Sequence, residues 1–117
     1  MTLFLTSSPC LYQHSPATLN PANGFLDRLR AALPEKPRTL FVCSDPDSFA
    51  MTDRFALDMV EAFRDAGLPF GDTAVLDRRN DPHTRELVEK AQFIVLMGGH
   101  VPTQNAYLWE LGLKELF

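Results

Sequence analysis

The strongest constraint on the fold is that short apolar runs alternate with segments of helical periodicity. The runs occupy residues 3–5, 39–43, 73–76 and 93–97, and each is followed, directly or after a loop, by apolar residues that recur every three to four positions. Strands that alternate with helices form a parallel sheet with right-handed crossovers and helices on both faces. The sequence therefore predicts an α/β fold, a three-layer sandwich with a mainly parallel sheet.

The runs also predict positions within the sheet. Residues 39–43 form a continuous apolar run, which is typical of a strand buried on both faces, and we expect a central parallel strand there. Residues 93–97 give the strongest strand signal in the sequence. Residues 73–76 are more polar at their start, which favours a place near the sheet edge. The segment 10–22 contains two prolines with serine, threonine and asparagine, a composition that predicts an irregular surface loop.

Local signals predict where three helices begin or end. Asn23 is an expected N-cap, and Asp81 before Pro82 is another, because a side-chain acceptor followed by proline suits the first helical turn. Gly67 is expected to end the longest helix in a left-handed conformation.

Length and charge exclude several classes of protein. A chain of 117 residues allows one domain, which we expect to span 1–117. The formal charge of −4 and the scattered basic residues argue against a nucleic-acid partner. The apolar runs are far shorter than the roughly 20 residues that cross a bilayer, and the N-terminus lacks a signal-peptide pattern. We therefore expect no membrane partner and a cytoplasmic location.

Cysteines and histidines offer little for a metal or redox centre. Cys10 and Cys43 are too few for a disulfide framework, and we expect reduced thiols, with Cys43 packed rather than nucleophilic. His14, His83 and His100 lie in separate segments without the spacing of a metal site. Nucleotide fingerprints and the Gly-x-Ser-x-Gly elbow are both missing from these residues. No metal and no cofactor are predicted.

The segment with most chemical content is Gly98, Gly99 and His100, which follows the last apolar run and precedes a helix. Ligands of parallel sheets bind beyond the carboxyl ends of the strands, and main-chain amides at a helix N-terminus suit a carboxylate or a developing oxyanion. The alternative is a tight turn whose glycines only satisfy backbone geometry.

Other strand-end residues have two interpretations each. Asp45 and Asp47 are either paired carboxylates or turn residues, and turn chemistry explains them adequately. Arg78 and Arg79 could meet an acidic substrate, although a solvated basic turn is commoner. Tyr107 and Trp109 are expected to be packing or interface residues.

The order of these segments resembles the N-terminal half of the peptidase E family, the serine peptidases that include dipeptidase E and cyanophycinase. The most specific part is residues 93–116. The resemblance implies a class I glutamine amidotransferase-like (flavodoxin-like) fold. It also implies that Gly98 and Gly99 match the glycine-rich turn that lends amides to the oxyanion hole, with His100 where many members have asparagine. The family's serine, on a Gly-x-Ser-Ala-Gly elbow, follows the next strand, which would lie beyond Phe117.

We therefore expect the N-terminal portion of a hydrolase that cleaves short peptides through an acyl-enzyme and is inactive alone. An incomplete sheet should expose apolar surface, which suggests a homodimer or a complementary C-terminal fragment as partner. The alternative is a non-catalytic module that binds a small ligand or a protein. A flavodoxin-like redox protein is disfavoured, because residues 3–5 lead into Ser7, Ser8 and Pro9 rather than a phosphate loop.

Overall fold

The structure, a computed structural model, describes residues 10–11, 18–19 and 24–116. The predicted strand at 3–5, the loop that follows it and His14 lie outside the described residues.

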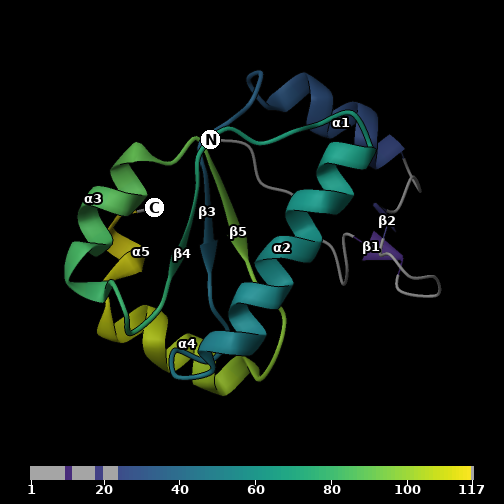
Figure 1. The fold of residues 1–117 in the computed structure, drawn as a ribbon. Coiled ribbons are helices and arrows are strands. Elements are labelled where there is room, and N and C mark those ends of the chain that lie inside the picture. Colours follow the sequence, from purple (N-terminus) through teal and green to yellow (C-terminus); the bar gives the residue numbers. More distant parts are fainter. Residues whose placement is uncertain (1–9, 12–17, 20–23, 117) are drawn as a thin grey trace.

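Three parallel strands form the central sheet, in the order β4-β3-β5 (Figure 1). Their bounds are Thr39–Val42 for β3, Thr73–Leu76 for β4 and Phe93–Leu96 for β5. All four residues of β3 are buried, and Leu40 pairs with Ala74 on one side and Ile94 on the other. The prediction of a central strand is confirmed, and β4 lies at an edge of this sheet as expected.

Helices cover both faces of the sheet, which confirms the three-layer sandwich. Phe41 packs with α1 and α2 on one face, while Leu40 and Val42 pack with α3, α4 and α5 on the other. The helices are α1 (Phe25–Ala32), α2 (Phe49–Asp65), α3 (Thr84–Lys90), α4 (Val101–Glu110) and α5 (Leu113–Leu116). In Figure 1, α2 lies on one side of the strands, α3 and α5 lie on the other, and α4 lies at the end to which the strands point.

The connections explain which helix lies on which face. From β3 the chain passes through α2 to β4, and from β4 it returns through α3 past β3 to β5. Right-handed crossovers that run in opposite directions place their helices on opposite faces. After β5 the chain enters α4, on the same face as α3. The neighbouring strands β3 and β5 therefore send the chain to opposite faces, which makes their carboxyl ends the switch point of the sheet.

The segment 10–22 is not wholly irregular, which corrects the expectation of a loop. Strand β1 (Cys10–Leu11) pairs antiparallel with β2 (Thr18–Leu19). Leu19 is buried in the cluster that α2 covers. This burial gives the segment an apolar contact that its polar composition did not predict.

One predicted helix cap is wrong, another falls on a residue outside the described part of the chain, and one helix stop is confirmed. Asn23 lies outside the described residues, and the N-cap of α1 is Gly24, with φ of 68°. Asp81 is the first residue of a 3-10 helix, η2 (Asp81–His83), because its carboxylate contacts Arg78 and the Tyr107 hydroxyl instead of capping. Gly67 has φ of 80° and follows α2 as expected.

Three large apolar side chains near β5 and α4 are exposed, namely Leu96, Val101 and Trp109. Such exposure agrees in kind with the expected apolar surface, while a homodimer or a complementary fragment stays a prediction. Among the helices of the described part, none combines the length and apolarity needed to cross a bilayer.

Candidate functional site

The candidate site is the switch point where the loops after β3 and β5 meet. Gly99 has φ of 155°, a conformation that side chains disfavour, and a Cβ there would lie 2.7 Å from the Cβ of Ser44 and closer still to its Oγ. Gly98 has no such restriction, since a Cβ at that residue would meet nothing within 4 Å. Glycine is therefore required at position 99 by the close approach of the two loops.

A glutamine holds the two strand ends together beneath this contact. Gln104, on the first turn of α4, donates from Nε2 to the carbonyl of Met97 at 2.7 Å and to the carbonyl of Cys43 at 3.3 Å. The Met97 amide in turn donates to the Val42 carbonyl at 3.0 Å. Gln104 thus continues the hydrogen bonding between β3 and β5 beyond the last residues of the two strands. Nothing in the sequence singled out this residue.

The imidazole of His100 caps α4. Its Nδ1 accepts from the Thr103 amide at 3.4 Å and lies 2.7 Å from Thr103 Oγ1. An N-cap of this kind satisfies one of the free amides of the first helical turn. Because Nδ1 of the ring is engaged by its own helix, His100 can offer a ligand at this turn its main-chain amide and the other ring nitrogen, Nε2.

The amides of Gly98, Gly99 and His100 donate no hydrogen bond to any acceptor in the described part of the chain. All three residues are exposed, and they directly precede α4. The helix dipole adds positive potential at this end. A carboxylate or an oxyanion placed at the turn would therefore find unused donors, and the role of these three residues in binding one stays a prediction.

The loop after β4 is organised by a buried carboxylate, Asp77, which is 1% exposed. Asp77 accepts from the Arg79 amide at 2.9 Å and from the Arg79 guanidinium at 2.7 Å. The same guanidinium binds Asp53 on α2 at 2.6 and 2.9 Å. The hydrogen bonds from Arg79 hold the pKa of the Asp53 carboxyl below its usual range. Arg79 therefore ties this loop to α2.

Arg78 makes the corresponding link to the opposite face. It binds the Glu110 carboxylate on α4 with two hydrogen bonds, at 2.6 and 3.0 Å, and lies over the ring of Tyr107. The hydrogen bond from Arg78 lowers the pKa of Glu110. Arg78 and Arg79 thus bind the chain's own carboxylates, and their proposed contact with an acidic substrate stays a hypothesis.

Asp45 is a turn residue, as its position suggested. Its carboxylate accepts from the Asp47 amide at 3.0 Å and from Ser48 Oγ at 2.9 Å, and the first of these bonds contributes most to lowering its pKa. Asp47 instead approaches Arg78 at 3.9 Å. The two carboxylates therefore serve different contacts rather than one paired site.

Cys43 is buried, as predicted, at the carboxyl end of the central strand. Desolvation, followed by the charges of Asp77 and Asp45, raises the pKa of its thiol to about 12. The thiolate is the reactive form of cysteine, and almost none is present near neutral pH.

We expect iodoacetamide at pH 8 to leave Cys43 unmodified in the folded protein and to alkylate it after unfolding in urea. Peptide mass spectrometry measures both states, and the Cys10→Ser variant makes Cys43 the sole thiol. Rapid alkylation of the folded variant would contradict a buried, inert role.

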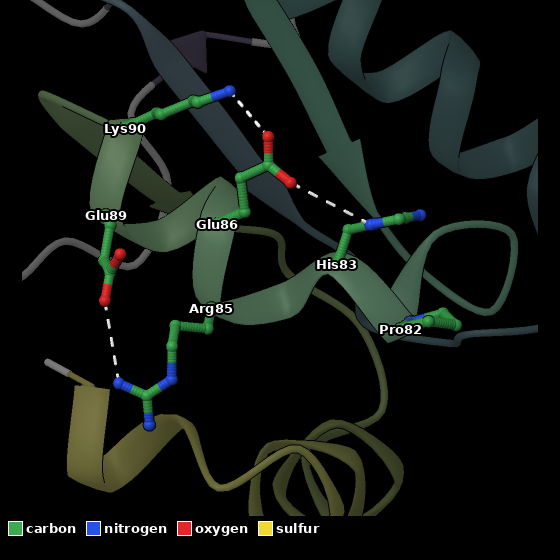
Figure 2. A pocket seen from close by; sticks show the side chains of 6 residues that line it. All are labelled: Pro82, His83, Arg85, Glu86, Glu89 and Lys90. Carbon is green, nitrogen blue, oxygen red and sulfur yellow. Dashed lines mark hydrogen bonds and ion pairs between the residues drawn. The ribbon is translucent and has the colours of Figure 1, made fainter.

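A separate hollow lies along the outer side of α3 (Figure 2). It is lined by Pro82, His83, Arg85, Glu86, Glu89 and Lys90. Glu86 binds Lys90 at 2.6 Å and approaches His83 at 3.9 Å, and Arg85 lies 3.6 Å from Glu89. These charges neutralise one another in an exposed setting, and Gly98, Gly99 and His100 are not among the lining residues. The hollow is therefore distinct from the switch point.

Sequence analysis located the strand-end loops but missed three residues within or near them. Ser44 and Asp77 lie in loops that were expected at the carboxyl edge, yet their contacts depend on how closely the loops approach. Gln104 gave no signal beyond its position early in a helix. In the part of the chain that the structure describes, no cluster of three or more His, Cys, Asp or Glu residues could hold a metal ion.

Comparison with known proteins adds no family assignment. No family model, curated protein or solved structure matches this chain. A functional proposal for this chain therefore depends on its α/β architecture and on the turn at residues 98–100.

Proposed function

We propose that this chain is the N-terminal portion of a peptidase E-like serine peptidase that hydrolyses short peptides. The observation that carries the proposal is the set of unused amides at residues 98–100, located where β3 and β5 send the chain to opposite faces. Ligands of open α/β sheets bind at such points. The order of the sequence segments supports the resemblance to that family, and the unused amides at the carboxyl edge of the sheet support a site for an oxyanion.

In this proposal the amides of Gly99 and His100 stabilise the tetrahedral intermediate of acyl transfer. A serine hydroxyl gives its proton to a histidine as the serine oxygen bonds to the peptide carbonyl carbon, and the carbonyl oxygen becomes an oxyanion. The carbonyl re-forms as the carbon–nitrogen bond breaks and the histidine passes that proton to the leaving amine. Water then hydrolyses the acyl-enzyme and restores the serine hydroxyl. Donors already aimed at the oxyanion lower the barrier because they need no reorganisation. The serine and its histidine are proposed to come from polypeptide outside residues 1–117.

The described residues support the proposal that the serine and the histidine come from other polypeptide. Within the described residues, the Thr103 hydroxyl lies beside the His100 imidazole, and this pair serves as the cap of α4. Cys43 is buried with a raised pKa. Purified 117-residue chain is accordingly expected to leave aspartyl dipeptides intact, and hydrolysis that persists through further purification would contradict the proposal.

Reading the coding sequence past Phe117 for a Gly-x-Ser-Ala-Gly segment is the first test. If it is present, the complete product should hydrolyse aspartyl dipeptides. We then expect His100→Pro to lower kcat by about 100-fold or more, the usual effect of losing an oxyanion donor. Proline fits because His100 has φ of −76°, and it removes the amide hydrogen together with the imidazole and its cap.

His100→Ala and His100→Asn are the matched controls. Alanine removes the cap but keeps the amide, and asparagine keeps both an acceptor for the cap and the amide. Both are expected to retain kcat within about tenfold, since neither removes the oxyanion donor. Equal losses for proline and alanine would assign the effect to the cap and contradict the oxyanion role.

The second candidate is a non-catalytic module that binds a small anion or a peptide carboxylate at the same turn. The observation that favours it is that the amides are unused, while the hydroxyl–imidazole pair of Thr103 and His100 serves as a helix cap. Calorimetry of the 117-residue chain with amino acids, dipeptides and phosphate tests this candidate. Binding that His100→Pro removes and His100→Ala retains supports it, and the absence of heat at millimolar ligand contradicts it.

A further inference from the structure

We infer that Gln104 is a positioning residue, whose carboxamide sets the separation of the β3 and β5 carboxyl ends and thereby holds the turn at residues 98–100 in place. The inference deepens the proposed function, on which its catalytic meaning rests, but the geometry and its test are independent of catalysis.

The carboxamide of Gln104 bridges two strands at once. Nε2 donates to the Met97 carbonyl of the β5 end and to the Cys43 carbonyl of the β3 end. An amide nitrogen carries two hydrogens, so both bonds can form together. Both partners are acceptors, which assigns the nitrogen rather than the oxygen to this position. Glutamine suits this position because its side chain is uncharged and supplies two N–H donors.

The bridge lies next to the groups that the candidate site uses. Met97 immediately precedes Gly98, and Cys43 immediately precedes Ser44, which contacts Gly99. A change in the distance between Met97 and Cys43 therefore moves both loops that meet at the switch point. Gln104 also lies one helical turn after His100, whose carbonyl accepts from the Gln104 amide at 3.1 Å. The residue thus fixes α4 and the two strand ends as one unit.

Two main-chain amides report separately on the two sides of β3. The Met97 amide donates to Val42 across the β3–β5 boundary, and the Cys43 amide donates to Leu76 across the β3–β4 boundary at 3.2 Å. A local opening at the Gln104 bridge should expose the first amide and leave the second protected. Global destabilisation should accelerate exchange of both.

The first test is hydrogen exchange followed by NMR in Gln104→Met, which keeps the side-chain length and removes the donors. We expect exchange of the Met97 amide to accelerate by about tenfold or more, the effect of losing hydrogen bonds of ordinary net strength, and exchange of the Cys43 amide to change less than twofold. Equal acceleration at both amides would overturn the inference.

The second test uses Gln104→Glu, in which donation depends on pH. The ionised carboxylate faces two carbonyl oxygens and donates nothing, whereas the protonated form donates one hydrogen bond. The pKa of the introduced carboxyl is therefore raised in the folded state. Its stabilising contribution is present below the ordinary glutamate value of about 4.3 and is lost as pH rises through the folded-state value. We expect the excess Met97 exchange, corrected for its intrinsic pH dependence, to shrink on acidification.

Asn105→Asp is the matched control for charge, because Asn105 is exposed on the same helical turn. Cys43 lies beside the bridge at the β3 end and His100 at the start of α4, and the charges of Asp77, Asp45 and Arg78 act on Cys43; all five groups are unchanged in this control. Should Gln104→Met fail to fold, thermal unfolding of Gln104→Glu and Asn105→Asp between pH 4 and 7 decides. A larger rise in unfolding temperature on acidification for Gln104→Glu than for Asn105→Asp supports the inference. An equal rise in the two variants overturns it.

The proposed function and the Gln104 inference are tested by different measurements, so that either can fail alone. Loss of the serine-peptidase hypothesis would follow from an inactive complete product, with the Met97 exchange result unaffected. Loss of the Gln104 inference would follow from uniform exchange, even in an active enzyme.

Discussion

Replacing Gly99 with alanine is expected to lower the free energy of unfolding by about 3 kcal/mol, from backbone strain and an added steric clash. The φ of 155° is one that an alanine rarely adopts, and the new methyl group would lie 2.7 Å from the Cβ of Ser44. Neither cost can be relieved by a rotamer change, because alanine has no side-chain torsion and the Ser44 Cβ is fixed to the main chain. Urea unfolding followed by circular dichroism measures the change.

Gly98→Ala is the matched control for this variant. A Cβ at Gly98 meets nothing within 4 Å, so alanine should be accepted with little change in stability. Ser44→Gly combined with Gly99→Ala should recover the part of the loss that is steric and leave the part that comes from φ. If alanine is equally costly at 98 and 99, or if the double variant recovers nothing, the two loops do not approach as described.

Replacing Asp77 with asparagine is expected to lower the free energy of unfolding by about 2 kcal/mol, the usual worth of hydrogen bonds to a charged group. The Asp77 carboxylate is buried and accepts from the main chain and the guanidinium of Arg79. Asparagine replaces one acceptor oxygen with a donor, which then faces the Arg79 donors. Urea unfolding again measures the loss.

The partners of this ion pair should respond unequally. Arg79→Ala is expected to destabilise more than Asp77→Asn, because it leaves a buried carboxylate without its cation. Asp53→Asn should have a small effect, since the Asp53 side chain is 54% exposed and its pairing with Arg79 is largely screened. Adding Asp77→Asn to Arg79→Ala should restore stability. Equal losses for Asp53→Asn and Asp77→Asn would contradict this account of the loop.

Most of the described sheet could be predicted from the sequence because its strands are apolar runs bounded by polar turns. Residues 39–43 and 93–97 correspond to β3 and β5 within one residue at their ends, and 73–76 corresponds to β4. The burial of β3 on both faces leaves a continuous apolar signal that survives without knowledge of the neighbours, and β5 carries a similar run although it lies at an edge of the described sheet. The β1–β2 pair gave no such signal, because each of its strands has two residues.

The candidate site was predictable in location but not in its contacts. The position of Gly98 and Gly99 after an apolar run was enough to place them at the carboxyl edge. That Ser44 touches Gly99, and that Gln104 bridges Met97 and Cys43, depends on the β4-β3-β5 order, which periodicity does not encode. The side-chain role of His100 as a cap likewise required the helix start to be known to one residue.

The central place of β3 has a consequence for how the chain acquires its structure during synthesis. Both pairing partners of β3 come later in the sequence, with β5 last among the described strands. When β3 leaves the ribosome, its four buried residues have no strand on either flank, and closure of the β3–β5 pair spans a long stretch of intervening chain. Nascent chains arrested before β5 should therefore be sensitive to protease and bind chaperones, and release of α4 should end that vulnerability.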